Sequence, residues 1–209
     1  MKKIFFAGVL SLLFASASFA QVKLGVTAGL NASNVIEENN EGSKYKAGFQ
    51  AGLVADFGIT ENFSIIPELL FSQRGGKDEI SEEGYKMSSS TTLNYLQLPV
   101  NFAYKFNVGY GSKLFIFAGP YAGYALSGKR KVDLKLGNGT DSGSGDIKFG
   151  SKEDEVKPFD FGLNAGIGYE YEKVFFKLQW NPGLANLTNV SGYSSKNTNV
   201  AVTVGYYFF

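Results

Sequence analysis

Apolar and polar side chains alternate one by one over most of this chain, and the pattern is clearest at its end. There Val200, Val202, Val204, Tyr206 and Phe208 alternate with small or polar-tipped residues. Successive side chains of a β-strand point to opposite faces, so this segment predicts a strand with one apolar face. Earlier segments show the same alternation. The predicted strands are residues 22–31, 48–57, 63–74, 95–106, 113–127, 159–171, 174–181 and 198–209.

The connections between these strands alternate between long and short. Long polar segments occupy 32–44, 75–91, 128–157 and 185–197, whereas the turns between them, such as 58–62 and 172–173, are short. Outer-membrane barrels have an even number of strands, long extracellular loops and short periplasmic turns. The sequence therefore predicts an all-β fold over residues 21–209. It is an eight-stranded antiparallel up-and-down transmembrane β-barrel with a filled polar interior and with both chain ends in the periplasm.

Aromatic residues on the apolar faces fall near the two ends of the predicted strands. Two such girdles, one at each membrane interface, are typical of transmembrane barrels. One predicted girdle contains Phe57, Tyr104, Phe106, Tyr169, Tyr171, Tyr206 and Phe208, and the other contains Phe71, Tyr124, Phe159, Phe161 and Trp180. The aliphatic band between them contains Leu53, Leu98, Val100, Ala118, Leu163 and Ala165.

Proline and glycine residues interrupt some of the predicted strands. Pro67, Pro99 and Pro120 each lack the backbone donor of a ladder hydrogen bond, so we expect a bulge or a local irregularity at some of them. The Gly-X-Gly spacings lie in strands and are not followed by a predicted helix, which argues against phosphate loops. We interpret these glycines as small inward residues that let a narrow barrel close.

The polar faces of the strands predict a network inside the barrel. An eight-stranded barrel is just wide enough for its own side chains to fill it, and charges there must be paired or hydrogen-bonded. Glu68 and Lys177 lie at similar heights on the third and seventh strands, so we expect them to meet across the axis. The predicted structural network contains Glu68, Lys177, Gln97, Asn101, Lys105, Asp160, Asn164 and Glu170.

The first twenty residues have the three-part layout of a secretory signal peptide. Lys2 and Lys3 precede an apolar run from Ile4 to Phe14, and small residues follow up to Ala20. The apolar run is shorter than the roughly 20 residues of a membrane-spanning helix, which argues against an uncleaved anchor. We therefore expect residues 1–20 to be cleaved and the mature chain to lie in the bacterial outer membrane. The formal net charge of +1 provides no basic field for nucleic acid.

The residue types narrow the possible chemistry. The chain contains no His and no Cys, which excludes Ser-His-acid and Cys-His catalysis, most zinc sites and any disulfide. A Ser-Lys or paired-carboxylate device is compatible with these residue types, but no such constellation is evident, so we expect no catalytic, cofactor-binding or metal-binding residues and no enzymatic activity. Asp133, Asp141, Asp146, Glu153, Asp154 and Glu155 in the longest loop are oxygen donors, but their spacing matches no calcium loop, and a solvated polar loop is the preferred interpretation.

Several segments together resemble a known family. They are KLGVTAGLNASNV from residue 23, PELLFSQRG from 67, NYLQLPVNFAY from 94, AGPYAGY from 118, FDFGLNAGIGY from 159 and the ending VGYYFF. In these motifs the chain resembles the porin-family, PorT-like outer-membrane β-barrel domain over nearly all of its mature length. The resemblance implies an eight-stranded outer-membrane barrel and no single shared activity. One departure is Phe209, which follows the expected final outward Phe208.

Three functional hypotheses follow. The first is a small outer-membrane barrel with a structural, surface-interaction or envelope-integrity role, not a wide diffusion pore, which contacts membrane lipid and other envelope proteins. Its loops 32–44, 75–91 and 128–157 are the expected contact regions. The second, from the PorT-like resemblance, is a component of a protein-secretion apparatus. The third is a soluble lipocalin-like barrel with apolar residues inside, which would bind a small apolar ligand.

Overall fold

The computed structural model describes residues 21–37, 43–82, 85–136 and 139–209. The predicted signal peptide, residues 1–20, lies outside the described residues, as do positions 38–42 of the first long loop. No helix in the described part of the chain is long and apolar enough to cross a membrane. The described strands are β1 (Gln21–Glu37), β2 (Ser43–Gly58), β3 (Phe63–Glu82), β4 (Tyr85–Gly109), β5 (Ser112–Leu136), β6 (Gly139–Asp146), β7 (Phe159–Tyr171), β8 (Val174–Pro182) and β9 (Ser195–Tyr207).

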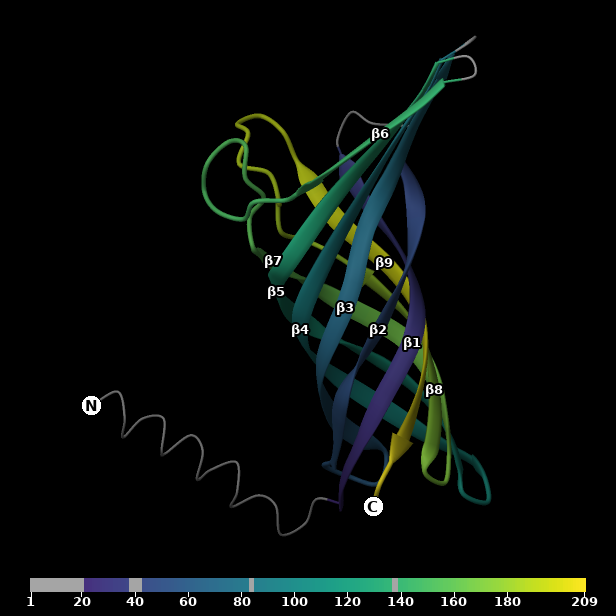
Figure 1. Cartoon of the computed structure of the whole chain (residues 1–209). Helices are drawn as coiled ribbons and strands as arrows, with labels where there is room; N and C mark the ends of the chain where they lie inside the picture. Colours follow the sequence, from purple (N-terminus) through teal and green to yellow (C-terminus); the bar gives the residue numbers. More distant parts are fainter. Residues whose placement is uncertain (1–20, 38–42, 83–84, 137–138) are drawn as a thin grey trace, which may run out of the picture.

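The strands close into a ring of antiparallel pairs (Figure 1). Within the ring, each of β1 to β5 and β7 to β9 pairs with two neighbours, and the β4–β5 and β1–β9 pairings close the circle. β6 stays outside the ring, because it pairs only with the far end of β5, from Lys129–Asp146 to Leu136–Gly139. The prediction of an eight-stranded antiparallel barrel is therefore confirmed, and β6 is an addition to it.

Three of the predicted loops contain long stretches of strand, and in the first of them, 32–44, β1 extends to Glu37 and β2 begins at Ser43. β3 and β4 continue their pairing to Glu82–Tyr85, and β4 and β5 continue theirs to Tyr85–Leu136, so most of 75–91 and the start of 128–157 lie in a sheet. The expectation of polar loops there is wrong, and the reason is physical. This part of the sheet rises beyond the apolar wall of the barrel, so neither face needs the apolar residues by which a membrane strand is identified.

The outer face of the barrel wall is apolar and the inner face is largely polar, as the alternation predicts. The side chains of Leu98, Leu163 and Val204 point outward and are 51%, 49% and 45% exposed. Gln97 and Asn164, on the same strands, are buried in the interior. The third strand, where the pattern is less clear, also follows this rule, because its polar positions share the inner face with two buried apolar residues, Ile66 and Leu70.

Aromatic contacts on the outer face lie near both ends of the strands. The rings of Tyr104 and Phe106 are 4.9 Å apart near one end, and those of Tyr124 and Phe159 are 5.0 Å apart near the other. Trp180 departs from the prediction, because it lies directly opposite Ala165, a residue of the aliphatic band. It therefore lies nearer the band than its assignment to a girdle implies.

Inside the barrel, aromatic rings lie directly opposite glycines. A Cβ atom added at Gly168 would come within 2.1 Å of the Phe115 ring, and one at Gly205 within 2.0 Å of the Phe175 ring. The inward glycines therefore leave the space that large inward rings fill. The cross-strand pairs are Phe115–Gly168, Phe117–Gly166, Tyr121–Gly162 and Phe175–Gly205.

The prolines interrupt pairing without changing its register. Around Pro67 the β2–β3 ladder passes from Val54–Glu68 to Phe57–Ile65 with two pairs missing. The β3–β4 ladder is interrupted in the same way beside Pro99, and the β4–β5 ladder beside Pro120. The expected irregularities are therefore gaps in the ladder, as the missing donor of proline explains. The register shifts lie elsewhere, at Tyr45/Gln50, Asn94/Tyr95 and Asn107/Gly109.

The glycine–aromatic pairs give a stability prediction. Gly168→Leu would push a side chain into the space of the Phe115 ring, and overpacking of this kind costs about 1–3 kcal/mol. Gly143→Leu is the matched control, because a Cβ atom there has no neighbour within 4 Å. Urea unfolding of the reconstituted barrel measures both. Equal unfolding midpoints for the two variants would contradict the packing described here.

Candidate functional site

Among the described residues, the interior of the barrel contains as many acidic as basic side chains. Its basic residues come from β1, β3, β4 and β8, and its acidic residues from β2, β3 and β7. They are Lys23, Arg74, Lys105 and Lys177 against Asp56, Glu68, Asp160 and Glu170, and all but the half-buried Lys23 are buried. Equal numbers of opposite charges let a poorly hydrated lumen remain neutral while each charge has a partner.

The middle of the lumen is crossed by the pair that the sequence predicts. Lys177 Nζ donates to Glu68 Oε1 at 2.5 Å, and both side chains are almost fully buried. Three strands separate β3 from β8 on either side of the ring, so the bond spans the barrel axis. Asn101 Nδ2 also donates to Glu68 Oε1, at 3.2 Å, and Asn164 Nδ2 donates to Asn101 Oδ1, at 3.2 Å. Together these residues join four strands across the lumen.

A second group of charges lies toward the end of the barrel where β1 begins and β9 ends. Lys105 Nζ donates to Asp56 and to Glu170 Oε2, the latter at 3.0 Å. Lys23 donates to the other oxygen of Glu170, and the Tyr207 hydroxyl donates to Asp56 at 3.3 Å. Five strands are thereby linked through two carboxylates.

A third group lies toward the opposite end and is centred on Asp160. Arg74 Nη1 lies 3.7 Å from Asp160 Oδ2, and Tyr121 donates to the same oxygen at 3.2 Å. Arg74 Nη2 donates to Gln97 Oε1 at 3.0 Å. Asn197 Nδ2 completes the group by donating to Asp160 at 3.0 Å. Each of the eight residues predicted for the interior thus belongs to one of the three groups.

Aromatic rings also belong to the interior, although the alternation of apolar and polar residues alone assigns them no role. Phe115, Phe117, Phe175 and Tyr207 form one buried cluster with smaller apolar residues. The Lys105 ammonium lies 5.9 Å from the Phe115 ring centroid, and the Lys177 ammonium lies 5.6 Å from that of Phe175. Such cation–π contacts stabilise a desolvated ammonium. The signal in the sequence was an inward aromatic on one strand and an inward glycine on its neighbour, but it requires the register to be known.

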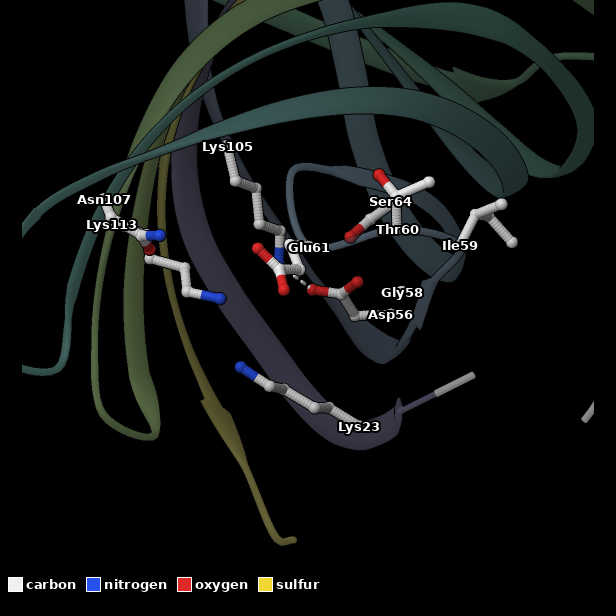
Figure 2. Close-up of a pocket in the computed structure, with 10 residues that line it drawn as sticks. All are labelled: Lys23, Asp56, Gly58, Ile59, Thr60, Glu61, Ser64, Lys105, Asn107 and Lys113. Atoms are coloured by element: carbon white, nitrogen blue, oxygen red, sulfur yellow. Dashed lines mark hydrogen bonds and ion pairs between the residues drawn. The ribbon is translucent and has the colours of Figure 1, made fainter. Parts of the chain in front are cut away.

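A cavity of about 400 Å³ opens at the end of the barrel where β1 begins and β2 ends. Figure 2 shows the side chains of Lys23, Lys105 and Lys113 around it, with Asp56 and Glu61 between them. Lys105 and Asp56 both line the cavity and belong to the charged group that also contains Glu170. The cavity is therefore a vestibule whose inner wall is formed by the lumen network.

Two of the acidic residues of the longest connection are engaged by neighbouring groups. Asp133 accepts hydrogen bonds from Ser142 Oγ, at 2.6 Å, and has Lys131 Nζ at 3.3 Å. The Ser142 hydrogen bond lowers the pKa of this exposed Asp133 carboxyl below its usual value. Glu155 instead accepts the backbone N–H of Lys152 at 3.1 Å. Over the described residues, no group of three or more such side chains is arranged to hold a metal ion.

A closed antiparallel ring with an apolar outer face and a lumen filled by paired charges defines a β-barrel of the bacterial outer membrane. Residues 15–189 match the family described as "Outer membrane protein beta-barrel domain", and the chain belongs to this family. The match carries neither the porin nor the PorT-like name suggested by the motifs. A comparison with curated proteins gives no match.

Solved structures of small outer-membrane proteins share the fold at low sequence identity. Neisserial surface protein A is 12% identical, with 88% of this chain and 97% of that chain covered and a TM-score of 0.47. The attachment invasion locus protein Ail of Yersinia pestis is 14% identical, with 89% and 98% covered and a TM-score of 0.41. OprG of Pseudomonas aeruginosa is 11% identical, with 90% and 94% covered and a TM-score of 0.45.

The pair across the lumen gives the second prediction. Lys177→Met leaves the Glu68 carboxylate buried without its cation, and breaking a buried pair in this way costs about 3–5 kcal/mol. Removing both charges, with Lys177→Met and Glu68→Leu together, should restore most of that loss. Lys44→Met is the control, because its pair with Glu79 lies on the surface and is worth less than about 1 kcal/mol. Denaturant unfolding of the natural chain, Lys177→Met, Glu68→Leu, the double variant and the control measures the coupling, and additive single effects would contradict it.

Proposed function

We propose that this chain is a surface-interaction protein of the outer membrane. In this proposal, a plugged barrel anchors a sheet that projects from the cell and contacts other molecules. The proposal includes cleavage of residues 1–20 and periplasmic chain ends, and it assigns no catalytic role to the chain. The observation that carries it is the length of β4 and β5, which remain paired far beyond the strands on the other side of the ring.

The filled lumen argues against a diffusion pore. Three groups of ion pairs and hydrogen bonds follow one another along the axis, and each joins strands on different sides of the ring. A solute that passed through would have to break buried pairs whose separation leaves charges unpaired. The lumen network is therefore proposed as a structural plug that holds the anchor rigid.

The projecting sheet has the features of a contact surface. β4 and β5 each contain 25 residues, whereas a strand needs only about 9–11 to cross the membrane. The long β3–β4–β5–β6 sheet rises at one end of the barrel, opposite the C-terminus and the beginning of β1 (Figure 1). Ile80, Met87 and Leu134 lie side by side across it, and Ile80 and Leu136 are 56% and 58% exposed. Exposed apolar rows of this kind suit contact with a protein.

Two alternative functions follow from the sequence, and the burial of the barrel residues contradicts one of them. A soluble lipocalin-like barrel required apolar residues inside and polar residues outside, and the burial of Gln97 and Asn164 with the exposure of Leu98 and Leu163 is the reverse. A role in a protein-secretion apparatus is the second candidate. It is supported by the PorT-like motifs and by the same projecting sheet, and co-purification with a secretion complex would distinguish it from a role in adhesion.

Shortening the projecting hairpin tests the proposal. Replacing residues 133–142 by Asn-Gly joins the paired Val132 and Gly143 by a two-residue turn and leaves the barrel untouched. In cells that lack the protein, the intact chain should restore surface adhesion and resistance to detergents, whereas the shortened chain should reach the membrane in equal amount without restoring adhesion. Full restoration by the shortened chain would contradict the proposal.

The orientation is checked in the same cells, because the natural chain contains no Cys. Ser142→Cys, at the projecting hairpin, should react with an impermeant maleimide on intact cells, whereas Thr60→Cys, in a short turn at the other end, should react only after the envelope is opened. The reverse labelling pattern would overturn the assignment of the projecting sheet to the cell surface.

A further inference from the structure

The outer face of the barrel wall changes from apolar to polar at a defined row on β3, β4 and β5. Phe71, Leu96 and Tyr124 lie in register on the apolar side of the change. In the next outward row, Gln73 Nε2 donates to Asn94 Oδ1 at 3.3 Å, and Asn94 Nδ2 donates to Ser127 Oγ at 2.9 Å. Amide and hydroxyl groups on the lipid-facing side mark the edge of the hydrocarbon layer, since they are costly to place within it.

Lysines occupy the outward rows immediately beyond this boundary. Lys129 lies opposite Thr92, and in the following row Lys77, Ser90 and Lys131 lie side by side. Two-residue steps are about 7 Å along a strand, and strand tilt reduces this to about 5 Å in height. These two rows are therefore roughly 5 and 10 Å above the boundary, at the level of lipid headgroups. We call the following set the basic belt: Lys44, Lys46, Lys77, Lys129 and Lys131.

Cations of the basic belt face one another. Lys44 lies directly opposite Lys77, and Lys129 and Lys131 follow one another on the outward face of β5. Like charges at directly opposite positions destabilise a sheet. Burial and the charge of Lys77 also lower the pKa of Lys46, whose ammonium donates to the Thr91 carbonyl at 3.2 Å. This arrangement would be relieved by an anion bound between the lysines.

On the outward face of these strands, the acidic residues are fewer than the cations of the basic belt and are already engaged. Glu79 accepts a hydrogen bond from Lys44 at 2.6 Å, and this bond lowers the pKa of its exposed carboxyl. Asp133 is held by Ser142 and Lys131, and Asp146 lies opposite Lys129 across the β5–β6 pair. The belt therefore retains a net positive charge on the face that borders the membrane.

We propose that the basic belt binds the phosphate groups of lipid headgroups in the outer leaflet, an inference that rests on the proposed orientation of the barrel. Phosphate is the anion that the membrane presents at this height, and Lys binds it as a point charge. The outward hydroxyls of Ser90 and Thr92 lie between the lysines and supply further donors. The belt covers only the β2–β5 side of the barrel, so bound lipid would support the strands that carry the projecting sheet.

Lipid retention by the full chain in nonionic detergent tests the proposal. The test variant is Lys77→Gln with Lys129→Gln and Lys131→Gln, and the control is Lys148→Gln with Lys152→Gln and Lys157→Gln, which removes the same charge from the segment between β6 and β7. The probes are diphosphorylated lipid A, its dephosphorylated form and inorganic phosphate. The natural chain and the control should bind diphosphorylated lipid A with similar affinity, and the belt variant about tenfold or more weakly, since each lysine near an anionic surface contributes about fivefold.

Three results would overturn the proposal. They are equal affinity of the belt variant and the control, equal affinity for the dephosphorylated lipid, and displacement of the lipid by inorganic phosphate at equal concentration, which would indicate a site for free anions. Gel mobility with and without heating shows whether each variant is folded before binding is measured. The shortened hairpin, which lacks 133–142, retains the substituted lysines of the belt, so loss of adhesion and loss of lipid binding can be separated.

Discussion

The structure depends on the neutrality of a lumen too narrow to hold much water. In the part of the chain that the structure describes, four basic and four acidic side chains share it. Their bonds run between strands that are far apart in the sequence, such as Lys177 with Glu68 and Lys23 with Glu170. An unpaired buried charge would be costly, so each charge must stay next to its partner. The pairs therefore fix the relative positions of the strands that carry them. The closed ring supplies the backbone hydrogen bonds that a membrane requires, and the paired charges fill its centre.

Large and small side chains inside the barrel complement one another, because the narrow lumen has to be filled without overlap. Phe115 and Phe175 occupy the volume left by Gly168 and Gly205 on neighbouring strands, and the ammonium groups of Lys105 and Lys177 lie over these rings. Aromatic packing and ion pairing therefore fill the lumen together. A plug of this kind makes the barrel an anchor, and it leaves the projecting sheet and the membrane-facing lysines as the surfaces available for contacts.

The sequence predicts those features that depend on local alternation. The eight strands, their lipid-facing sides and the inward position of residues such as Gln97 follow from a period of two, because a membrane strand must be apolar on one face. The projecting parts of β4 and β5 could not be predicted in this way, since water surrounds both of their faces. Partners inside the lumen depend on ring order and register, and only Glu68 with Lys177, at similar heights on opposite strands, could be paired beforehand. The bonds from Arg74 and the glycine–aromatic pairs required the structure.

The natural fluorescence of Trp180, the only tryptophan in the chain, tests most directly whether the apolar face of the strands contacts lipid. Its side chain is on the outer wall, opposite Ala165 and Val200. In bilayers of lipids brominated on their acyl chains, the account predicts strong quenching of this fluorescence and little quenching by acrylamide from the water. Quenching by acrylamide with no effect of the brominated lipids would contradict it.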